Sequence, residues 1–272
     1  MLLKLQLLAC VFYLLCYIAQ VKKDKVKSDK VYIYGRHALT EALRHKPKAI
    51  KNVFLERPEE EKEIVELATA NSISVKPLGG GELRTVGENA VHQGVIGILN
   101  TTALVTDLKT FLENLDVAKN PAIAVCAEVQ DPHNLGAIIR SAAALGLSGV
   151  IIPEHRQAPI TGTVVKTSVG MVFKIPVVSV GNVNQTLREL KERGFWIYGL
   201  DMEGEKLTET KFDRPSVFVV GNEGGGIREK SLELCDYKLS IPMHARAESL
   251  NAAVSGAVVF YEWSRQNPDH LT

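Results

Sequence analysis

The sequence predicts an α/β protein whose C-terminal half is built on a parallel sheet covered by helices on both faces. From residue 122 onward, short apolar runs alternate with segments whose apolar residues recur at helical spacing, which is typical of a parallel sheet with crossover helices. Three polar and glycine-rich segments also begin where an apolar run stops. In α/β proteins such loops lie at the carboxyl edge of the sheet, where ligands bind.

The N-terminal segment, residues 1–28, does not follow this pattern. Leu7 to Ala19 is an unbroken run of 13 apolar residues, with Lys4 before it and a lysine cluster after it. Such a run is short for a membrane span and closer to the core of a signal peptide. A membrane anchor, a signal peptide and a start site assigned too far upstream are the three interpretations. We favour the last, and we expect a cytoplasmic protein with no membrane partner.

Residues 29–102 predict a small α/β domain, which at about 70 residues is large enough to fold. We expect strands at 31–34, 52–55, 73–75 and 95–99. We expect helices at 38–44 and 59–70, and a loop at 79–81. Between residues 22 and 51 there are ten basic and three acidic side chains. Such a patch can neutralise phosphates although the formal charge of the chain is only +1; a solvated tail and helix face is the alternative interpretation.

Residues 103–120 predict a linker that carries one helix at 107–115, and residues 121–268 predict the parallel-sheet domain. Its expected strands lie at 122–129, 149–152, 173–178, 196–200, 217–220 and 237–241. Its expected helices lie at 135–145, 163–169, 184–192, 227–234 and 249–265. Since the strands are apolar along their whole length, we expect the sheet to be buried on both faces.

The three loop segments combine side chains that carry chemistry with bare backbone amides. They are Asp131–Arg140 (DPHNLGAIIR), Gly221–Gly226 (GNEGGG) and Ile241–Asn251 (IPMHARAESLN). The strands before them belong to one predicted sheet, so an arginine, two asparagines, a glutamate and a serine are expected around one pocket.

In order and spacing these segments resemble the motifs of the SpoU (TrmH-like) family of RNA ribose 2′-O-methyltransferases, within the SPOUT superfamily. The motifs read N-x-G-x-x-x-R, G-x-E-G-x-G and I-P-M-x-G-x-x-x-S-L-N, and Ala245 departs from the glycine of the third. The resemblance implies a trefoil knot, a homodimer, S-adenosylmethionine as methyl donor and RNA as substrate. Tyr34-Gly35 and His92-Gln93-Gly94 resemble the family's L30e-like substrate-binding domain, and this domain arrangement is similar to that of the bacterial 23S rRNA guanosine 2′-O-methyltransferases.

The resemblance also implies roles for individual residues. Five are expected at the catalytic centre, namely Arg140, Asn134, Glu223, Ser249 and Asn251. Three are expected to contact the cofactor, namely Gly221, Ile241 and Leu250. Four of them have a structural alternative: Asn134 and Ser249 as helix N-caps, Glu223 as a loop acid bonded to nearby amides, and Arg140 as a surface arginine paired with an acid. Gly221 is expected to let a ligand approach the main chain.

Other classes of protein are less consistent with the sequence. The four cysteines form no C-x-x-C pair, so no metal site is expected. The glycine-rich segments lack the G-x-G-x-x-G spacing of a dinucleotide enzyme. Two rivals stay open: a tRNA ribose 2′-O-methyltransferase, and a non-catalytic RNA-binding protein of the same fold.

Overall fold

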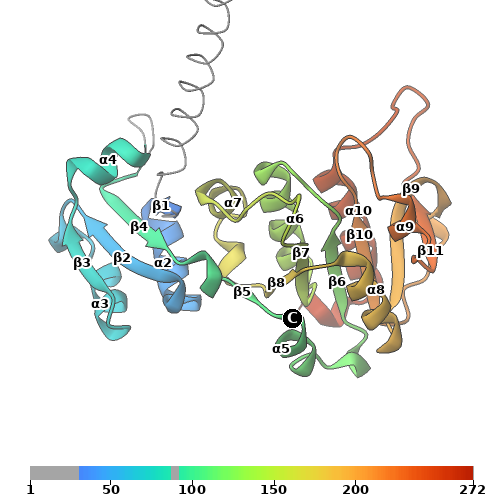
Figure 1. Cartoon of the computed structure of the whole chain (residues 1–272), viewed down its shortest axis with the longest axis horizontal. Coiled ribbons are helices and arrows are strands. Elements are labelled where there is room, and N and C mark those ends of the chain that lie inside the picture. The colour runs from blue at the N-terminus through green and yellow to red at the C-terminus, as the bar shows by residue number, and fades with distance from the viewer. Residues whose placement is uncertain (1–30, 87–91, 272) are drawn as a thin grey trace, which may run out of the picture. The chain divides into compact units, whose positions relative to one another are not determined.

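A computed structural model of the chain describes residues 31–86 and 92–271 (Figure 1). The N-terminal segment, and with it the expectations for residues 1–28, lies outside the described residues. Among the residues that are described, no helix is long and apolar enough to cross a membrane.

A four-stranded sheet with the order β1-β4-β2-β3 forms the first part of the described chain. Its strands are β1 (Val31–Tyr34), β2 (Ile50–Leu55), β3 (Ser74–Pro77) and β4 (Val95–Leu99), and its helices are α2 (Arg36–His45), α3 (Lys62–Ala70) and α4 (Gly80–Val86). The strand β4 is buried along its whole length because β1 and β2 both pair with it, antiparallel. The glycines at 79–81 were expected in a loop, which is wrong, since α4 begins among them.

A seven-stranded sheet with the order β11-β9-β10-β6-β7-β8-β5 forms the second part (Figure 1). Its strands are β5 (Val105–Thr106), β6 (Ala122–Cys126), β7 (Gly149–Pro153), β8 (Val177–Val180), β9 (Trp196–Lys206), β10 (Ser216–Val220) and β11 (Tyr237–Ser240). Every neighbouring pair is parallel, so the predicted parallel sheet is confirmed. The strand β5 lies within the segment expected to be a linker.

Helices cover this sheet on both faces, as predicted. They are α5 (Leu108–Glu113), α6 (Pro132–Ala144), α7 (Gly162–Thr167), α8 (Val183–Glu192), α9 (Glu229–Leu232) and α10 (Ala252–Gln266). Alternate residues of β6 point to opposite faces. Ala124 belongs to the core that α6 and α10 contribute to, whereas Ile123 and Val125 pack in the core that contains side chains of α5 and α8.

The helices α6 and α10 show the largest differences from their expected starts at residues 135 and 249. The helix α6 begins at Pro132, and its N-cap is Asp131, whose carboxylate accepts from the His133 amide at 2.8 Å. Proline at the first helical position needs no amide partner, so the cap falls at Asp131 and not at Asn134. The helix α10 begins at Ala252 with Asn251 as its N-cap, so Ser249 is not the cap.

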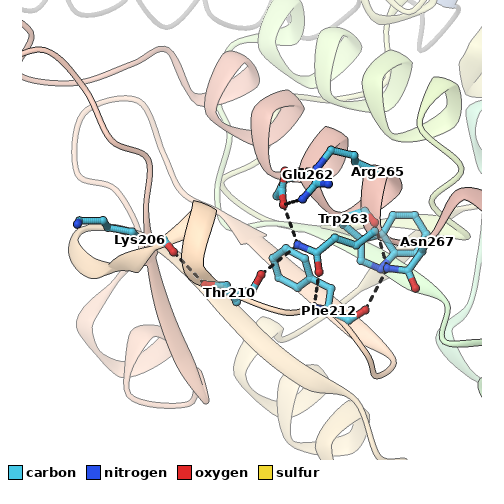
Figure 2. A network of polar contacts seen from close by, with 8 residues as sticks. Lys206, Thr210, Phe212, Glu262, Trp263, Arg265 and Asn267 are labelled. Carbon is cyan, nitrogen blue, oxygen red and sulfur yellow. Dashed lines mark hydrogen bonds and ion pairs between the residues drawn. The ribbon is translucent and has the colours of Figure 1, made fainter.

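The C-terminal end of α10 is tied to the segment between β9 and β10 by a network that we call the 210–212 brace (Figure 2). The Gln266 side chain accepts from the Phe212 amide and donates to the Thr210 carbonyl, each at 3.0 Å. Asn267 Nδ2 donates to the Phe212 carbonyl at 3.0 Å. Glu262 accepts from Gln266 and from Arg265, both at 2.7 Å. The brace satisfies backbone groups of an irregular segment that has no ladder partner there.

Candidate active site

The three polar segments follow β6, β10 and β11, as the sequence analysis expected. The strands β6 and β10 are direct neighbours, and β9 alone separates β10 from β11. Because all these strands are parallel, their carboxyl ends share one edge of the sheet. Segments that lie far apart in the sequence are thereby brought to one place.

A hydrogen-bonded chain of three side chains joins the segments. Asn134 Nδ2 donates to Glu223 Oε1 at 2.7 Å, across 89 residues of sequence. Asn251 Nδ2 donates to Asn134 Oδ1 at 2.9 Å, across 117 residues. We call this chain the Asn134–Glu223–Asn251 network. It connects three of the five residues expected at the catalytic centre.

The N-terminus of α10 sets the direction of this network. Asn251 Oδ1 accepts from the amides of Ala253 and Val254, at 2.9 and 3.3 Å. The Nδ2 group of Asn251 therefore donates to the side-chain oxygen of Asn134. The side-chain nitrogen of Asn134 in turn donates to the Glu223 carboxylate. Each donor faces an acceptor, so both asparagine side chains are held in a single orientation.

The Glu223 carboxylate is the acceptor at the end of the network. Burial would raise its pKa, but the hydrogen bond from Asn134 and bonds from the backbone of Glu223, Gln130 and Asp131 outweigh that effect, so the pKa lies below its ordinary value. Glu223 is thus ionised at neutral pH, and its exposed carboxylate keeps acceptor capacity for a ligand.

The glycine loop that carries Glu223 closes on itself. Asn222 and Gly226 exchange backbone hydrogen bonds at 2.9 Å, and Gly226 has a φ of 62°. A Cβ on Gly221 would lie 2.3 Å from the carbonyl carbon of Gly226. Close packing of the loop is thus sufficient to require glycine at 221, and the expectation that this glycine lets a ligand approach the main chain stays a prediction.

A cavity of about 600 Å³ opens beside this loop, within the size range of small-molecule sites. The predicted cofactor residues Gly221, Ile241 and Leu250 line it, together with the predicted catalytic residues Glu223 and Ser249.

Asp201, Met202 and Glu203 also line this cavity, and the sequence analysis missed them. They lie in β9, which was expected to end at Leu200 but continues to Lys206, with a register shift against β11. The one available signal was the pair of acids directly after the apolar run.

A second hollow, of about 610 Å³, opens on the surface of α6 and α10. Asn134 and Asn251 line it, and most of its remaining wall is the small and apolar surface of α6 and α10. Val254 and Tyr261, both in this wall, are 47% and 59% exposed. We call this surface the α6–α10 groove. The network runs from the groove to the cavity that Glu223 lines.

Arg140 is not among the residues that line either hollow. It follows Asn134 by six residues on α6, which places it about 240° around the helix. Its side chain is exposed and forms no hydrogen bond or ion pair with any other described residue. Among the described residues, all five guanidinium donors of Arg140 are thus without a partner, and the catalytic role of Arg140 stays a prediction.

No cluster of histidine, cysteine, aspartate and glutamate in residues 31–86 and 92–271 could hold a metal ion. The fold and the cavity together define an α/β protein with a small-molecule site at the carboxyl edge of a parallel sheet. Residues 121–261 match the model of the SpoU rRNA Methylase family, and residues 32–102 match the model described as RNA 2′-O ribose methyltransferase substrate binding. The chain therefore belongs to the SpoU rRNA methylase family, as its motifs predicted.

Individual relatives agree with this assignment. The chain is 37% identical over 238 residues to the 23S rRNA (guanosine-2′-O-)-methyltransferase RlmB of Neisseria meningitidis, covering 86% of this chain and 94% of the relative. It is 36% identical to the RlmB protein of Bordetella pertussis, covering 85% and 96%. The solved structure of the SpoU methyltransferase AviRb from Streptomyces viridochromogenes superposes with a TM-score of 0.74 at 23% identity, covering 91% of this chain and 93% of that one. This structural likeness supports the fold.

Proposed function

We propose that the protein transfers a methyl group from S-adenosylmethionine to a ribose 2′-hydroxyl of RNA, at a guanosine of 23S rRNA. The observation that carries the proposal is the Asn134–Glu223–Asn251 network, which joins the three family motifs at the wall of a cavity. The choice of 23S rRNA rests on relatives with that named substrate, which match most of the chain.

The cavity fits the proposed cofactor in size and in chemistry. Ile241 and Leu250 offer apolar surface for a purine ring, and Asp201, Glu203 and Glu223 offer carboxylates. Negative charge around the cavity suits a ligand that carries a sulfonium and an ammonium group. S-Adenosylmethionine, when bound, supplies an electrophilic methyl group to an attacking oxygen.

The residues of this chain have to position the 2′-hydroxyl and stabilise the charge that develops on its oxygen. Glu223, held by Asn134 and ionised, can accept a hydrogen bond from a substrate hydroxyl in this proposal. Ser249 lines the same cavity and can donate or accept. Holding such groups in one orientation before the substrate arrives is a large part of catalysis.

Arg140 provides the positive charge in this proposal. A guanidinium stays protonated at neutral pH, so it has no free lone pair with which to accept a proton. It can bind a phosphate next to the target ribose through two parallel bonds and stabilise an oxyanion. The free donors of Arg140 are consistent with that role.

The finer features of the family belong to the same proposal. We propose that the sheet domain contains the trefoil knot, that residues 29–102 form an L30e-like RNA-binding domain, and that the protein works in the cytoplasm as a homodimer. The α6–α10 groove supports the dimer, because a second copy would cover the exposed Val254 and Tyr261. Analytical ultracentrifugation tests it: the wild type should sediment as a dimer and Tyr261→Asp as a monomer, while a monomeric wild type would refute the dimer.

Methylation of purified transcripts tests the function. Full-length 23S rRNA and a tRNA mixture are each incubated with the protein and S-adenosylmethionine, and released nucleosides are measured by mass spectrometry. We expect 2′-O-methylguanosine in 23S rRNA alone. Methylation of tRNA alone would favour the tRNA enzyme, and failure to bind S-adenosylmethionine in calorimetry would favour the non-catalytic RNA-binding protein.

A further inference from the structure

Two arginines near the site share one carboxylate. Arg228 Nη2 lies 2.7 Å from Glu128 Oε2, and Arg156 Nη1 lies 4.0 Å from Glu128 Oε1. The side chains of Arg228 and Arg156 are 57% and 63% exposed, whereas that of Glu128 is 24% exposed. One carboxylate cannot neutralise two guanidinium groups, so the cluster keeps a net positive charge and unused donors. We call it the Arg156–Arg228 pair.

The pair lies at the same sheet edge as the candidate active site. Glu128 follows β6, Arg156 follows β7 and Arg228 follows β10, and these three strands are adjacent in the order β10-β6-β7. Asn222 Nδ2 donates to the Glu128 carbonyl at 2.8 Å. The loop that carries Glu223 is thus bonded directly to the residue that holds the two arginines.

Folding stability alone does not account for this cluster. Glu128 and Arg156 have φ values of 66° and 57°, a left-handed conformation that costs free energy for residues other than glycine. Both ion pairs of Glu128 are made with arginines whose side chains are more than half exposed, and such pairs contribute little to stability. Strained backbone that persists at such a site is more often associated with ligand contact than with stability.

We propose that the Arg156–Arg228 pair binds a backbone phosphate of the RNA strand beside the target nucleotide. Guanidinium groups match phosphate through paired hydrogen bonds, and the exposed faces of both side chains are open to a strand that approaches the glycine loop. Glu128 accepts a hydrogen bond from Arg228, lies within ion-pair distance of Arg156 and lowers the net charge of the pair. The proposal rests on the RNA substrate of the proposed function.

Alanine variants test the phosphate contact. Arg156→Ala and Arg228→Ala should each raise the KM for the 23S rRNA transcript about tenfold and reduce the slope of log affinity against log salt by about one. The kcat and the calorimetric affinity for S-adenosylmethionine should stay at the wild-type values.

Arg193→Ala is the matched control. Arg193 is also exposed and paired, with Glu189 at 3.3 Å, but it lies between the end of α8 and the start of β9, at the amino edge of the sheet. Its substitution should leave the RNA affinity and the salt slope unchanged. If the Arg156 and Arg228 variants behave like Arg193→Ala, the proposal is refuted.

Glu128→Gln separates RNA binding from a purely structural role. Removal of the negative charge should strengthen RNA binding several-fold if the pair binds phosphate. A structural cluster would instead show unchanged or weaker RNA binding and a lower thermal midpoint, and this result would overturn the proposal. Filter binding of 23S rRNA without methyl donor gives these affinities even when no methylation occurs, so failure of the proposed function is distinguishable.

Discussion

The two ends of α10 carry polar networks of opposite character. At its N-terminus, Asn251 takes part in a network of side chains that ends at the exposed carboxylate of Glu223, beside a cavity. At its C-terminus, Gln266 and Asn267 satisfy backbone groups of Thr210 and Phe212 in the 210–212 brace (Figure 2).

The difference lies in what each network leaves available. The side chains of the brace form hydrogen bonds with the protein's own backbone, which stabilises the fold. The network at the N-terminus ends at the exposed carboxylate of Glu223, so it orients a group that can act on a ligand. Variants at the N-terminal end should therefore affect mainly activity, and variants at the C-terminal end should affect mainly stability.

The largest expected effect follows from removal of the Arg140 side chain, which provides the positive charge in the proposed function. Arg140→Ala should lower kcat about 10³-fold, because one donor to a developing oxyanion is worth that much. The affinity for S-adenosylmethionine in calorimetry should stay unchanged, since Arg140 does not line the cavity. Turnover at the wild-type rate would remove Arg140 from the mechanism.

The next effect tests the network itself. Asn134→Ala should lower kcat about 10²-fold, because Glu223 loses the partner that orients it and small misplacements cost that much. Asn251→Ala should act through the same chain, so the double variant should lose little more activity than either single variant. Additive losses in steady-state kinetics would show that the two asparagines act independently.

The brace should respond in stability instead of activity. Gln266→Ala leaves the Phe212 amide and the Thr210 carbonyl without their partner, which should lower the free energy of unfolding by about 1–3 kcal/mol. Chemical denaturation measures this loss, and kcat should change less than twofold. Gln185→Ala, on the exposed side of α8, is the control and should leave stability unchanged. A large loss of activity in folded Gln266→Ala protein would contradict the contrast.

The smallest effect concerns the two carboxylates. Burial opposes ionisation of Glu223 but is outweighed by its hydrogen bonds, and the bond from Arg265 lowers the pKa of Glu262, so both lie below the ordinary value of 4.5. A carboxylate whose pKa is lowered by folding stabilises the folded protein at pH values above its ordinary pKa of 4.5. This contribution to the free energy of unfolding is lost as the pH falls through the folded-state pKa. Glu223→Gln and Glu262→Gln should therefore be less stable than wild type at pH 7. In denaturation at falling pH the difference should shrink below pH 4.5; a growing difference would contradict the assignment.

Much of the fold could be predicted from local patterns. Strands buried on both faces are apolar along their whole length, so β7 and β10 were found close to their observed limits. The strand β6 begins where it was expected but ends at Cys126, before the expected end at residue 129. The strand β5 was missed because it has two residues and exists only through its pairing with β8. The start of α6 was misplaced because Asp131-Pro132 reads equally well as a turn and as a cap followed by proline.

The site could be predicted only where the chain carries a motif. The motifs and the parallel sheet led to Asn134, Glu223 and Asn251, which the structure joins. Asp201 and Glu203 reach the cavity through a register shift of β9 against β11, which no local pattern reveals. Glu128 and Arg228 meet across 100 residues, and their contact depends on the order of the strands.

The most direct test of the account compares 23S rRNA methylated by the wild type with that exposed to folded Asn134→Ala protein at equal S-adenosylmethionine occupancy. Mass spectrometry of the released nucleosides should detect 2′-O-methylguanosine for the wild type and about one-hundredth as much for the variant at early times. Equal amounts from both proteins, or none from the wild type, would contradict the claim that this network orients the groups that methylate RNA.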